Sequence, residues 1–385
     1  MKRKDIAIAA YYETSFSRKP DRDVYDYATE AATGALKKAG LGKRDIDGLV
    51  VTMALSGASE PMWSARINEA LGLETRWLQT MDTGGTSVIT GIARAASAIR
   101  EGRAEAVLLV AADAPMTASN ERYMGYRTNF EFPFGPMGPP GLFGFLQKRY
   151  EHQYPITVEQ LAKVAITQRR HAQLNPNALL RDEMTVETYR NSRMISDPIR
   201  LLDCVMRCNG GEALVITKAD RARKLASIPV YVTGLGEVHN YRASEPLADV
   251  TDVGMGAAGR QALKEAGLSI SDIQTFQPYD DFIIAVVLQL ESLGFCGPGE
   301  GGKFVERTDL SFAGTLPLNT GGGQISAGQP GLAGGAVNVV EAVRQLQREG
   351  GKRQVKRCEN ALVTGIGTVA YLRSWHSSAV MVLEV

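Results

Sequence analysis

The chain carries a copy of one segment of its own sequence in its second half. ALKKAGLGKRDIDGLV, residues 35–50, aligns without a gap with ALKEAGLSISDIQTFQ, residues 262–277. Each copy predicts the same three elements: a helix that ends at a glycine, a turn with an Asp-Ile pair, and a buried strand. Two copies of such a unit indicate an internal duplication, which restricts the fold to one that is built twice.

A second pair of segments follows in the same order. AASAIREGRAEAVLLVAAD, residues 95–113, has the order helix, Arg-Glu-Gly, basic turn and buried strand, and residues 342–367, AVRQLQREGGKRQVKRCENALVTGIG, repeat it. This alternation predicts an α/β fold with mainly parallel strands and crossover helices in each half. We therefore expect one half over residues 1–225, with an inserted lid or loop domain over residues 115–200, and the other over residues 226–385.

The segment from Met81 to Asp113 predicts the central helix of the fold. Apolar and small residues recur through residues 88–99 at three- and four-residue spacing, which gives one buried stripe. Most other positions are alanine or glycine, so neighbouring elements can approach on more than one side. The helix begins at Gly84 and Gly85, where backbone N–H groups and the positive end of the helix dipole face whatever lies there.

Composition excludes several classes of protein. Lys and Arg number 43 against 42 Asp and Glu, so a net charge of +1 gives no basis for binding nucleic acid or an anionic membrane. No run approaches the roughly 18 apolar residues of a membrane helix, and residues 6–10 predict a first strand rather than a signal peptide. Four cysteines in 385 residues favour a reducing compartment. We therefore expect a cytoplasmic protein with no metal site.

The insertion is dense in Gly, Pro, Met and aromatic residues from Pro115 to Pro155, so it cannot be regular throughout. We expect its segment from Tyr123 to Phe145 to form a lid or tunnel wall, because long loops within compact folds are commonly functional. Thr157 with Gln160 predicts a capping box at the start of a helix, and Thr185 predicts the start of another.

Several motifs resemble those of the thiolases and their sterol-carrier-protein-type relatives. The central helix is similar to the one that begins at the nucleophilic cysteine in that family, and Gly85 stands at the cysteine position. The segment PYDDF, residues 278–282, is similar to the family's His-Asp-Cys-Phe motif, with Tyr279 at the histidine. In LNTGGGQISAGQPGLAGG, residues 318–335, Gln329 stands where the family has the histidine of Gly-His-Pro. The turn TGIG, residues 364–367, has no cysteine.

The resemblance covers nearly the whole chain and implies the thiolase fold, a five-layered αβαβα arrangement of two duplicated halves. The missing cysteine implies the branch that includes the steroid side-chain-cleaving acyl-CoA aldolases. Retro-aldol cleavage of a β-hydroxyacyl-CoA needs a base at the β-hydroxyl and donors for the thioester enolate, but no covalent acceptor. The resemblance also implies a homodimer that works with a small zinc-ribbon and OB-fold subunit, with coenzyme A present as part of the substrate.

These considerations select the candidate site residues. Tyr279 is the expected base, and Gln329 with the amides at Gly84 and Gly85 are the expected donors. The residues expected at the catalytic centre are Gly85, Tyr279, Asp280, Gln329 and His376. The residues expected to bind the acyl-CoA are Gly84, Gly322, Gly323, Gly328, His239, Tyr241, Arg169 and Arg223. Further candidates to bind the CoA phosphates are Arg122, Arg127, Arg170 and Arg181, and the alternatives to Tyr279 are His376, Tyr371, His239 and Tyr241.

Two other functions stay open at this level. One is a thiolase or acetyl-CoA acyltransferase with a displaced cysteine, for which Cys208 and Cys296 are the nearest candidates. The other is a non-catalytic, CoA-binding scaffold whose partner subunit carries the chemistry. The identity of the acyl group does not follow from the sequence.

Overall fold

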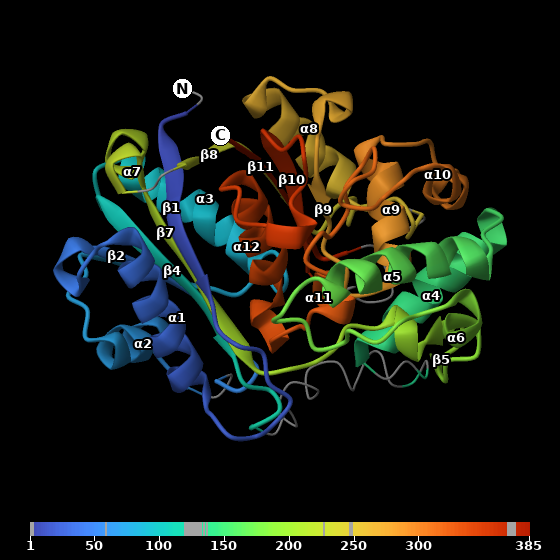
Figure 1. Cartoon of the computed structure of the whole chain (residues 1–385), viewed down its shortest axis with the longest axis horizontal. Helices are drawn as coiled ribbons and strands as arrows, with labels where there is room; N and C mark the ends of the chain where they lie inside the picture. Colours follow the sequence, from blue (N-terminus) through green and yellow to red (C-terminus); the bar gives the residue numbers. More distant parts are fainter. Residues whose placement is uncertain are drawn as a thin grey trace.

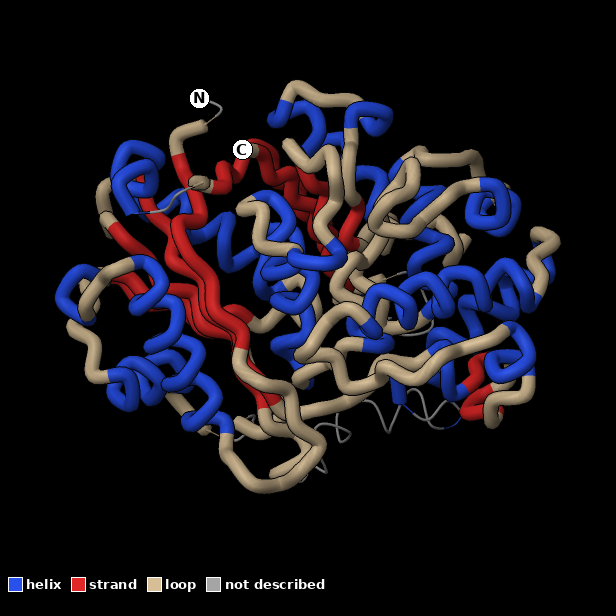
Figure 2. The backbone as a smooth tube through the Cα atoms, viewed as in Figure 1, coloured by secondary structure: helices blue, strands red, loops and turns tan. Residues whose placement is uncertain are grey.

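Nine of the described strands form one mixed sheet (Figures 1 and 2). The computed structural model describes residues 4–57, 60–118, 133, 135, 138–225, 228–245, 249–367 and 375–385. The strands of the sheet are, in spatial order, β3 (Trp77–Met81), β2 (Gly48–Thr52), β4 (Ala106–Asp113), β7 (Gly210–Lys218), β1 (Ile6–Glu13), β8 (Val230–His239), β11 (Ser377–Glu384), β10 (Asn360–Ile366) and β9 (Phe276–Gln277). A separate hairpin pairs β5 (Met194–Ser196) with β6 (Ile199–Arg200).

The sheet consists of two halves with the same strand order, which meet at β1 and β8. From the outside inward, β2, β4, β7 and β1 correspond to β9, β10, β11 and β8. In each half the outer pair is parallel and the next two pairs are antiparallel. The duplication is therefore confirmed, but the expectation of mainly parallel strands is wrong. β11 follows β10 after about ten residues, too few for a crossover helix, so the two pair as antiparallel neighbours.

Two central helices lie between the halves of the sheet (Figure 1). α3 (Ser87–Arg100) and α12 (Gly335–Leu346) pack on each other and share one apolar core with strands of both halves. α1 (Val24–Ala39) and α2 (Trp63–Leu71) cover the outer face of the first half, and α8 (Met255–Ala266) and α9 (Ile283–Leu293) cover that of the second. The predicted order of five layers is confirmed.

The two copies of the repeated segment fold alike in detail. α1 ends at Gly40 with a φ of 67°, and α8 ends at Gly267 with a φ of 63°. Asp45 and Asp272 then each accept, at 2.8 Å, a hydrogen bond from the backbone N–H three residues earlier. Each carboxylate closes a short 3₁₀ turn, and the chain continues into β2 or β9.

The insertion between β4 and β7 contains α4 (Gly138–Gln153), α5 (Val158–Gln173) and α6 (Val186–Arg190). α4 and α5 lie beside α9, and α6 packs on α5 (Figure 1). The predicted capping box is confirmed, because Thr157 Oγ1 accepts from the Gln160 N–H at 3.3 Å and Gln160 Oε1 accepts from the Thr157 N–H at 3.0 Å. Thr185 caps α6 as expected. Most of the segment expected to form a lid, including residues 123–132, lies outside the described residues.

Asp113, the last residue of β4, fills the end of the first half of the sheet. Its buried carboxylate accepts hydrogen bonds from the N–H groups of Leu55 at 2.7 Å and Ser56 at 3.0 Å, which follow β2. It also accepts one from the N–H of Leu332 at 3.0 Å, just before α12. A Cβ on Gly331 would lie 2.1 Å from this carboxylate, so no space remains there.

Candidate active site

Tyr279 lies where the end of β9 meets the start of α3. Its N–H donates to Thr364 Oγ1 at 2.9 Å, and its carbonyl oxygen accepts from Gln289 Nε2 at 2.8 Å. Thr364 Oγ1 and Gln289 Oε1 are hydrogen-bonded to each other as well. This buried network fixes the Tyr279 backbone, and with it the direction of a side chain that is only 5% exposed.

The ring of Tyr279 occupies the space in which a side chain at residue 85 would lie. A Cβ on Gly85 would be 2.2 Å from Tyr279 Cζ and 2.4 Å from its hydroxyl oxygen, whereas ordinary contact distances are about 3.5–4.0 Å. Gly85 is also crowded through its carbonyl oxygen, since Cβ atoms on Gly335 and Gly365 would lie 2.6 Å and 2.8 Å from it. The glycine at 85 and the tyrosine at 279 are therefore complementary in shape.

Gln329 brings the glycine-rich loop, residues 319–329, to Tyr279. Its Nε2 donates to the Tyr279 hydroxyl at 3.4 Å, a long hydrogen bond. Its N–H donates to the Met206 carbonyl at 2.7 Å, and its own carbonyl accepts from the Cys208 N–H at 3.1 Å. The structure thus places Gly85 from one half beside Tyr279 and Gln329 from the other.

The side chain of Asp280 binds the glycine-rich loop. Burial raises the pKa of Asp280 to about 7, and the hydrogen bonds that it accepts lower it. Gly323, which begins α11 (Gly323–Ser326), has a φ of 62°, and a Cβ there would lie 2.1 Å from Asp280 Oδ2, so the position requires glycine. The carboxylate accepts four hydrogen bonds at 3.0 to 3.3 Å, from the N–H groups of Gln324 and Ile325 and the side chains of Gln168 and Asn338.

A polar face of α5, together with Asn175 just beyond its end, binds the same loop from the other side. Asn175 Nδ2 donates to the Gly321 carbonyl at 2.8 Å, and Arg169 Nε donates to Ser326 Oγ at 3.0 Å. Sequence analysis missed this function of α5. Gln168, His171 and Asn175 recur at helical spacing, but a polar stripe on a predicted helix ordinarily indicates a face exposed to solvent.

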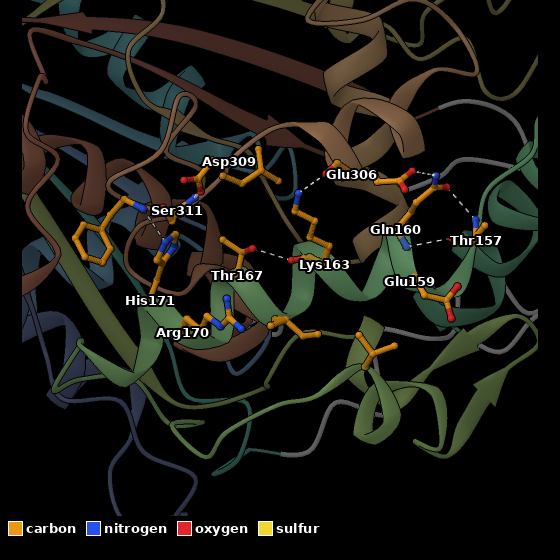
Figure 3. A pocket seen from close by; sticks show the side chains of 14 residues that line it. Thr157, Glu159, Gln160, Lys163, Thr167, Arg170, His171, Glu306, Asp309 and Ser311 are labelled. Atoms are coloured by element: carbon orange, nitrogen blue, oxygen red, sulfur yellow. Dashed lines mark hydrogen bonds between the residues drawn. The ribbon is translucent and has the colours of Figure 1, made fainter.

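His171 joins this polar face to a separate cavity of about 510 Å³ (Figure 3). Its Nδ1 is 3.1 Å from the carbonyl oxygen of Asn319, and its Nε2 accepts from the Phe312 N–H at 3.0 Å. Burial lowers the pKa of His171 to about 4, so the ring is neutral and Nδ1 carries the proton. Figure 3 shows α5 along one wall, with Lys163 hydrogen-bonded to the carbonyl of Glu306 at 2.6 Å. None of the predicted catalytic residues lines this cavity.

The predicted histidines lie together where β8 ends and β11 begins. His239 Nδ1 and His376 Nδ1 lie 2.9 Å and 3.0 Å from Ser377 Oγ, and both side chains are exposed where β8 and β11 pair. Tyr241 packs on the start of α8. Tyr371 lies outside the described residues.

The arginines predicted to bind the acyl-CoA lie in different parts of the fold. Arg169 is only 6% exposed and burial lowers its pKa, so it binds the loop rather than solvent. Arg223, on α7 (Ala219–Leu225), follows β7 and pairs with Asp220, whereas Gln329 pairs just before β7 begins. β7 has 9 residues, so the two ends are roughly 30 Å apart, which does not fit the role predicted for Arg223. Arg122 and Arg127 lie outside the described residues.

The remaining glycines of the predicted site are packed against neighbours. A Cβ on Gly322, whose φ is 103°, would lie 2.7 Å from Ala172 Cβ, and one on Gly328 would lie 2.9 Å from Cys208 Sγ. Gly84 turns the chain into α3 with a φ of 64°. These glycines therefore let the loop and the start of α3 approach their neighbours closely.

The cysteines are in environments that disfavour the thiolate. Burial raises the pKa values of Cys204, Cys296 and Cys358 to about 12 and that of Cys208 well above its usual range. Among the described residues, no group of three or more His, Cys, Asp and Glu side chains could hold a metal ion. No helix in the described ranges combines the length and the apolar character that crossing a membrane requires.

Comparison with known proteins shows the family. Residues 6–220 match the thiolase N-terminal domain, and residues 236–384 match the thiolase C-terminal domain-like family. A steroid side-chain-cleaving aldolase from Thermomonospora curvata is 34% identical, over 93% of this chain and 94% of the relative. An acetyl-CoA acetyltransferase from Methanothermobacter thermautotrophicus is 32% identical, over 94% and 96%. A 17-hydroxy-3-oxo-4-pregnene-20-carboxyl-CoA lyase from Mycobacterium tuberculosis is 32% identical, over 93% and 95%.

A solved structure agrees with these relatives. The Ltp2-ChsH2(DUF35) aldolase superposes with a TM-score of 0.86 at 31% identity, over 99% of this chain and 98% of that one. This chain belongs to the thiolase superfamily and has the thiolase fold. Within the superfamily it is a relative of the acyl-CoA aldolases and lyases.

Proposed function

We propose that this protein is an acyl-CoA aldolase that cleaves the Cα–Cβ bond of a β-hydroxyacyl-CoA without a covalent acyl-enzyme. The observation that carries the proposal is the packing of Tyr279 against Gly85, because a phenol ring fills the space in which a nucleophilic side chain would begin. The similarity to a steroid side-chain-cleaving aldolase and to a carboxyl-CoA lyase supports this reaction class. It also favours a bulky, apolar acyl group such as a steroid side chain.

In the proposed reaction Tyr279 acts as the phenolate, and its oxygen accepts the proton of the β-hydroxyl group. The Cα–Cβ bond breaks, its electron pair forms the thioester enolate, and the β-carbon becomes the carbonyl carbon of the released aldehyde or ketone. The Gln329 amide and the N–H groups at Gly84 and Gly85 donate to the enolate oxygen, and the positive end of the α3 dipole adds to this stabilisation. The proton held by Tyr279 returns to the α-carbon and yields the shortened acyl-CoA.

Acyl transfer is the second candidate function, since one relative is an acetyl-CoA acetyltransferase. That reaction requires a thiolate to accept the acyl group. The raised pKa values of Cys208 and Cys296 disfavour a thiolate at either candidate position. The third candidate, a scaffold without activity of its own, would leave the buried network around Tyr279 without a role.

We further propose a cytoplasmic homodimer that binds a small zinc-ribbon and OB-fold subunit. The similarity to the Ltp2-ChsH2(DUF35) aldolase supports a second component. Coenzyme A enters as part of the substrate. Arg170, which lines the cavity beside α5, and Arg181 are exposed, so they are the better candidates for its phosphates.

The test compares Tyr279→Phe with Tyr150→Phe, which also removes the hydroxyl of a buried tyrosine, one that is bound to Glu291 away from the site. With a steroidal β-hydroxyacyl-CoA, Tyr279→Phe should lower kcat by about 10²- to 10⁴-fold, the usual effect of losing a positioned acid–base group. Tyr150→Phe should keep kcat. Intact mass measurement after incubation with acetoacetyl-CoA should show no acetyl adduct. A stoichiometric adduct, or wild-type turnover by Tyr279→Phe, would refute the proposal.

A further inference from the structure

Gln324, on α11, is a buried side-chain amide that the described part of the chain leaves without hydrogen bonds. The residue is 0% exposed, and neither Oε1 nor Nε2 has a partner. Its backbone is fixed on both sides, because its N–H donates to Asp280 Oδ1 at 3.0 Å and its carbonyl accepts from the Met206 N–H at 3.1 Å. The backbone therefore holds the side chain in place, while its polar atoms stay unpaired.

The unpaired amide lies beside Gln329. A Cβ on Gly334 would lie 2.5 Å from Gln324 Oε1 and 2.5 Å from Gln329 Cγ, so both side chains pack on the same surface of Gly334. The next residue, Gly335, begins α12 and approaches the carbonyl oxygen of Gly85. Gln324 thus lies in the wall that also carries Gln329 and borders the start of α3.

Packing alone does not explain an amide at this position, because an apolar side chain would fill the same space at a lower cost in stability. A buried polar group without a partner destabilises the folded state, and exchanging oxygen and nitrogen would not help, since neither atom is paired. The side chain of Asn319 is unpaired as well, but of the two only Gln324 packs on Gly334 with Gln329. The partner of Gln324 is therefore best sought in a ligand of the same site.

We infer that Gln324 binds substrate, and that its Nε2 donates a hydrogen bond to the thioester carbonyl oxygen of the bound acyl-CoA. This rests on the proposed function, because the ligand is taken to be an acyl-CoA. Gln329 already donates to the Tyr279 hydroxyl. That bond uses one of the two amide hydrogens of Gln329, and the unpaired amide of Gln324 can join the other at the carbonyl oxygen, whose negative charge grows as the enolate forms. A donor fixed at that oxygen lowers the barrier of the reaction as well as binding the substrate.

The test uses two ligands that differ in the carbonyl group. Acetyl-CoA has a thioester carbonyl, and S-ethyl-CoA, a thioether, lacks it. In calorimetric titrations Gln324→Met should bind acetyl-CoA roughly 3- to 10-fold more weakly than wild type, the effect of one neutral hydrogen bond, and should bind S-ethyl-CoA with unchanged affinity. With a β-hydroxyacyl-CoA the variant should lose about 10²- to 10³-fold in kcat/KM, with most of the loss in kcat.

Two further variants control for folding. Gln324→Met should keep or raise Tm, because an apolar side chain replaces an unpaired amide of similar length. Gln345→Met makes the same substitution at a buried glutamine whose amide is fully hydrogen-bonded at the far end of α12, so it should lower Tm and leave both affinities unchanged. Gln324→Leu also removes the donor, and should repeat the selective loss for acetyl-CoA.

The titrations decide the inference without turnover. The inference would be overturned if Gln324→Met lost affinity equally for both ligands or kept its affinity for acetyl-CoA. It would also be overturned if wild type bound neither ligand. A selective loss for acetyl-CoA together with no cleavage of any β-hydroxyacyl-CoA by wild type would support the binding role of Gln324 and refute the proposed function instead.

Discussion

Replacing Gly85 by alanine should disturb both stability and catalysis, through one contact. The new Cβ would lie 2.2 Å from Tyr279 Cζ, more than 1 Å inside the ordinary contact distance. The ring must therefore move, and overpacking of this kind costs about 1–3 kcal/mol in the free energy of unfolding. Because a shift of about 1 Å in a catalytic group can lower the rate by about 10²-fold, kcat should fall by a similar factor.

A double-mutant cycle measures whether Tyr279 is the group that is displaced. Tyr279→Ala alone should cost about 3–5 kcal/mol, as for other large aromatic side chains that leave a cavity. In that background Gly85→Ala should lose its cost, because its methyl group then enters the space of the missing ring. The expected coupling energy is about 1–3 kcal/mol, measured from urea unfolding curves followed by circular dichroism.

Tyr279→Phe is the control for this cycle. It removes the hydroxyl and keeps the ring, so Gly85→Ala should cost as much in the Phe background as in wild type. If the costs of Gly85→Ala and Tyr279→Ala add to within about 0.5 kcal/mol, the two positions do not exclude each other, and the shape argument for a site without a nucleophile fails.

Three further predictions concern the surroundings of Tyr279. Gln329→Ala should lower kcat on a β-hydroxyacyl-CoA by about 10²- to 10³-fold while CoA binding persists, and a rate within threefold of wild type would argue against its amide as an enolate donor. Since burial lowers the pKa of His171 from 6.5 to about 4, the unfolded chain binds more protons between these values, and stability should fall by about 3 kcal/mol from pH 6.5 to 4. That part of the loss should be missing in unfolding curves of His171→Gln, and an unchanged slope would contradict it. Gly323→Ala should cost about 2–5 kcal/mol, from backbone strain and the clash with Asp280, whereas Gly351→Ala, with a φ of 59° and nothing within 4 Å, should cost only the strain of about 1–2 kcal/mol.

The duplicated architecture could be predicted because local sequence determines its parts. Each copy of the repeated helix is followed by a glycine and by a turn with an aspartate. Both residues form hydrogen bonds there with residues a few positions away, so the same residues form the same geometry in each copy. The direction of β7 and β11 could not be predicted in this way. The direction of each strand depends on the path of the connection that precedes it. The hydrophobic pattern within a strand is the same for both directions.

The candidate site was predictable only where a motif marked it. Gly85, Tyr279 and Gln329 stand in motifs, and they meet. His376 and His239 were chosen for their chemistry. The structure brings both to Ser377, and their part in catalysis stays a prediction. The residues that hydrogen-bond the loop from α5, such as His171, belong to no motif. A polar residue on a predicted helix is expected to face solvent unless its partner is known. Burial of such residues becomes visible only in three dimensions.

The duplication gives the fold two equivalent places, and Asp113 lies at the one that does not hold Tyr279. By the symmetry of the halves, the end of β9 with the start of α3 has a twin, formed by the end of β2 with the start of α12. The first holds Tyr279 and Gln329, and the twin holds a carboxylate that binds Leu55, Ser56 and Leu332 and leaves no space. At one of the two equivalent places a buried carboxylate therefore joins the halves, and at the other stand the candidate catalytic residues.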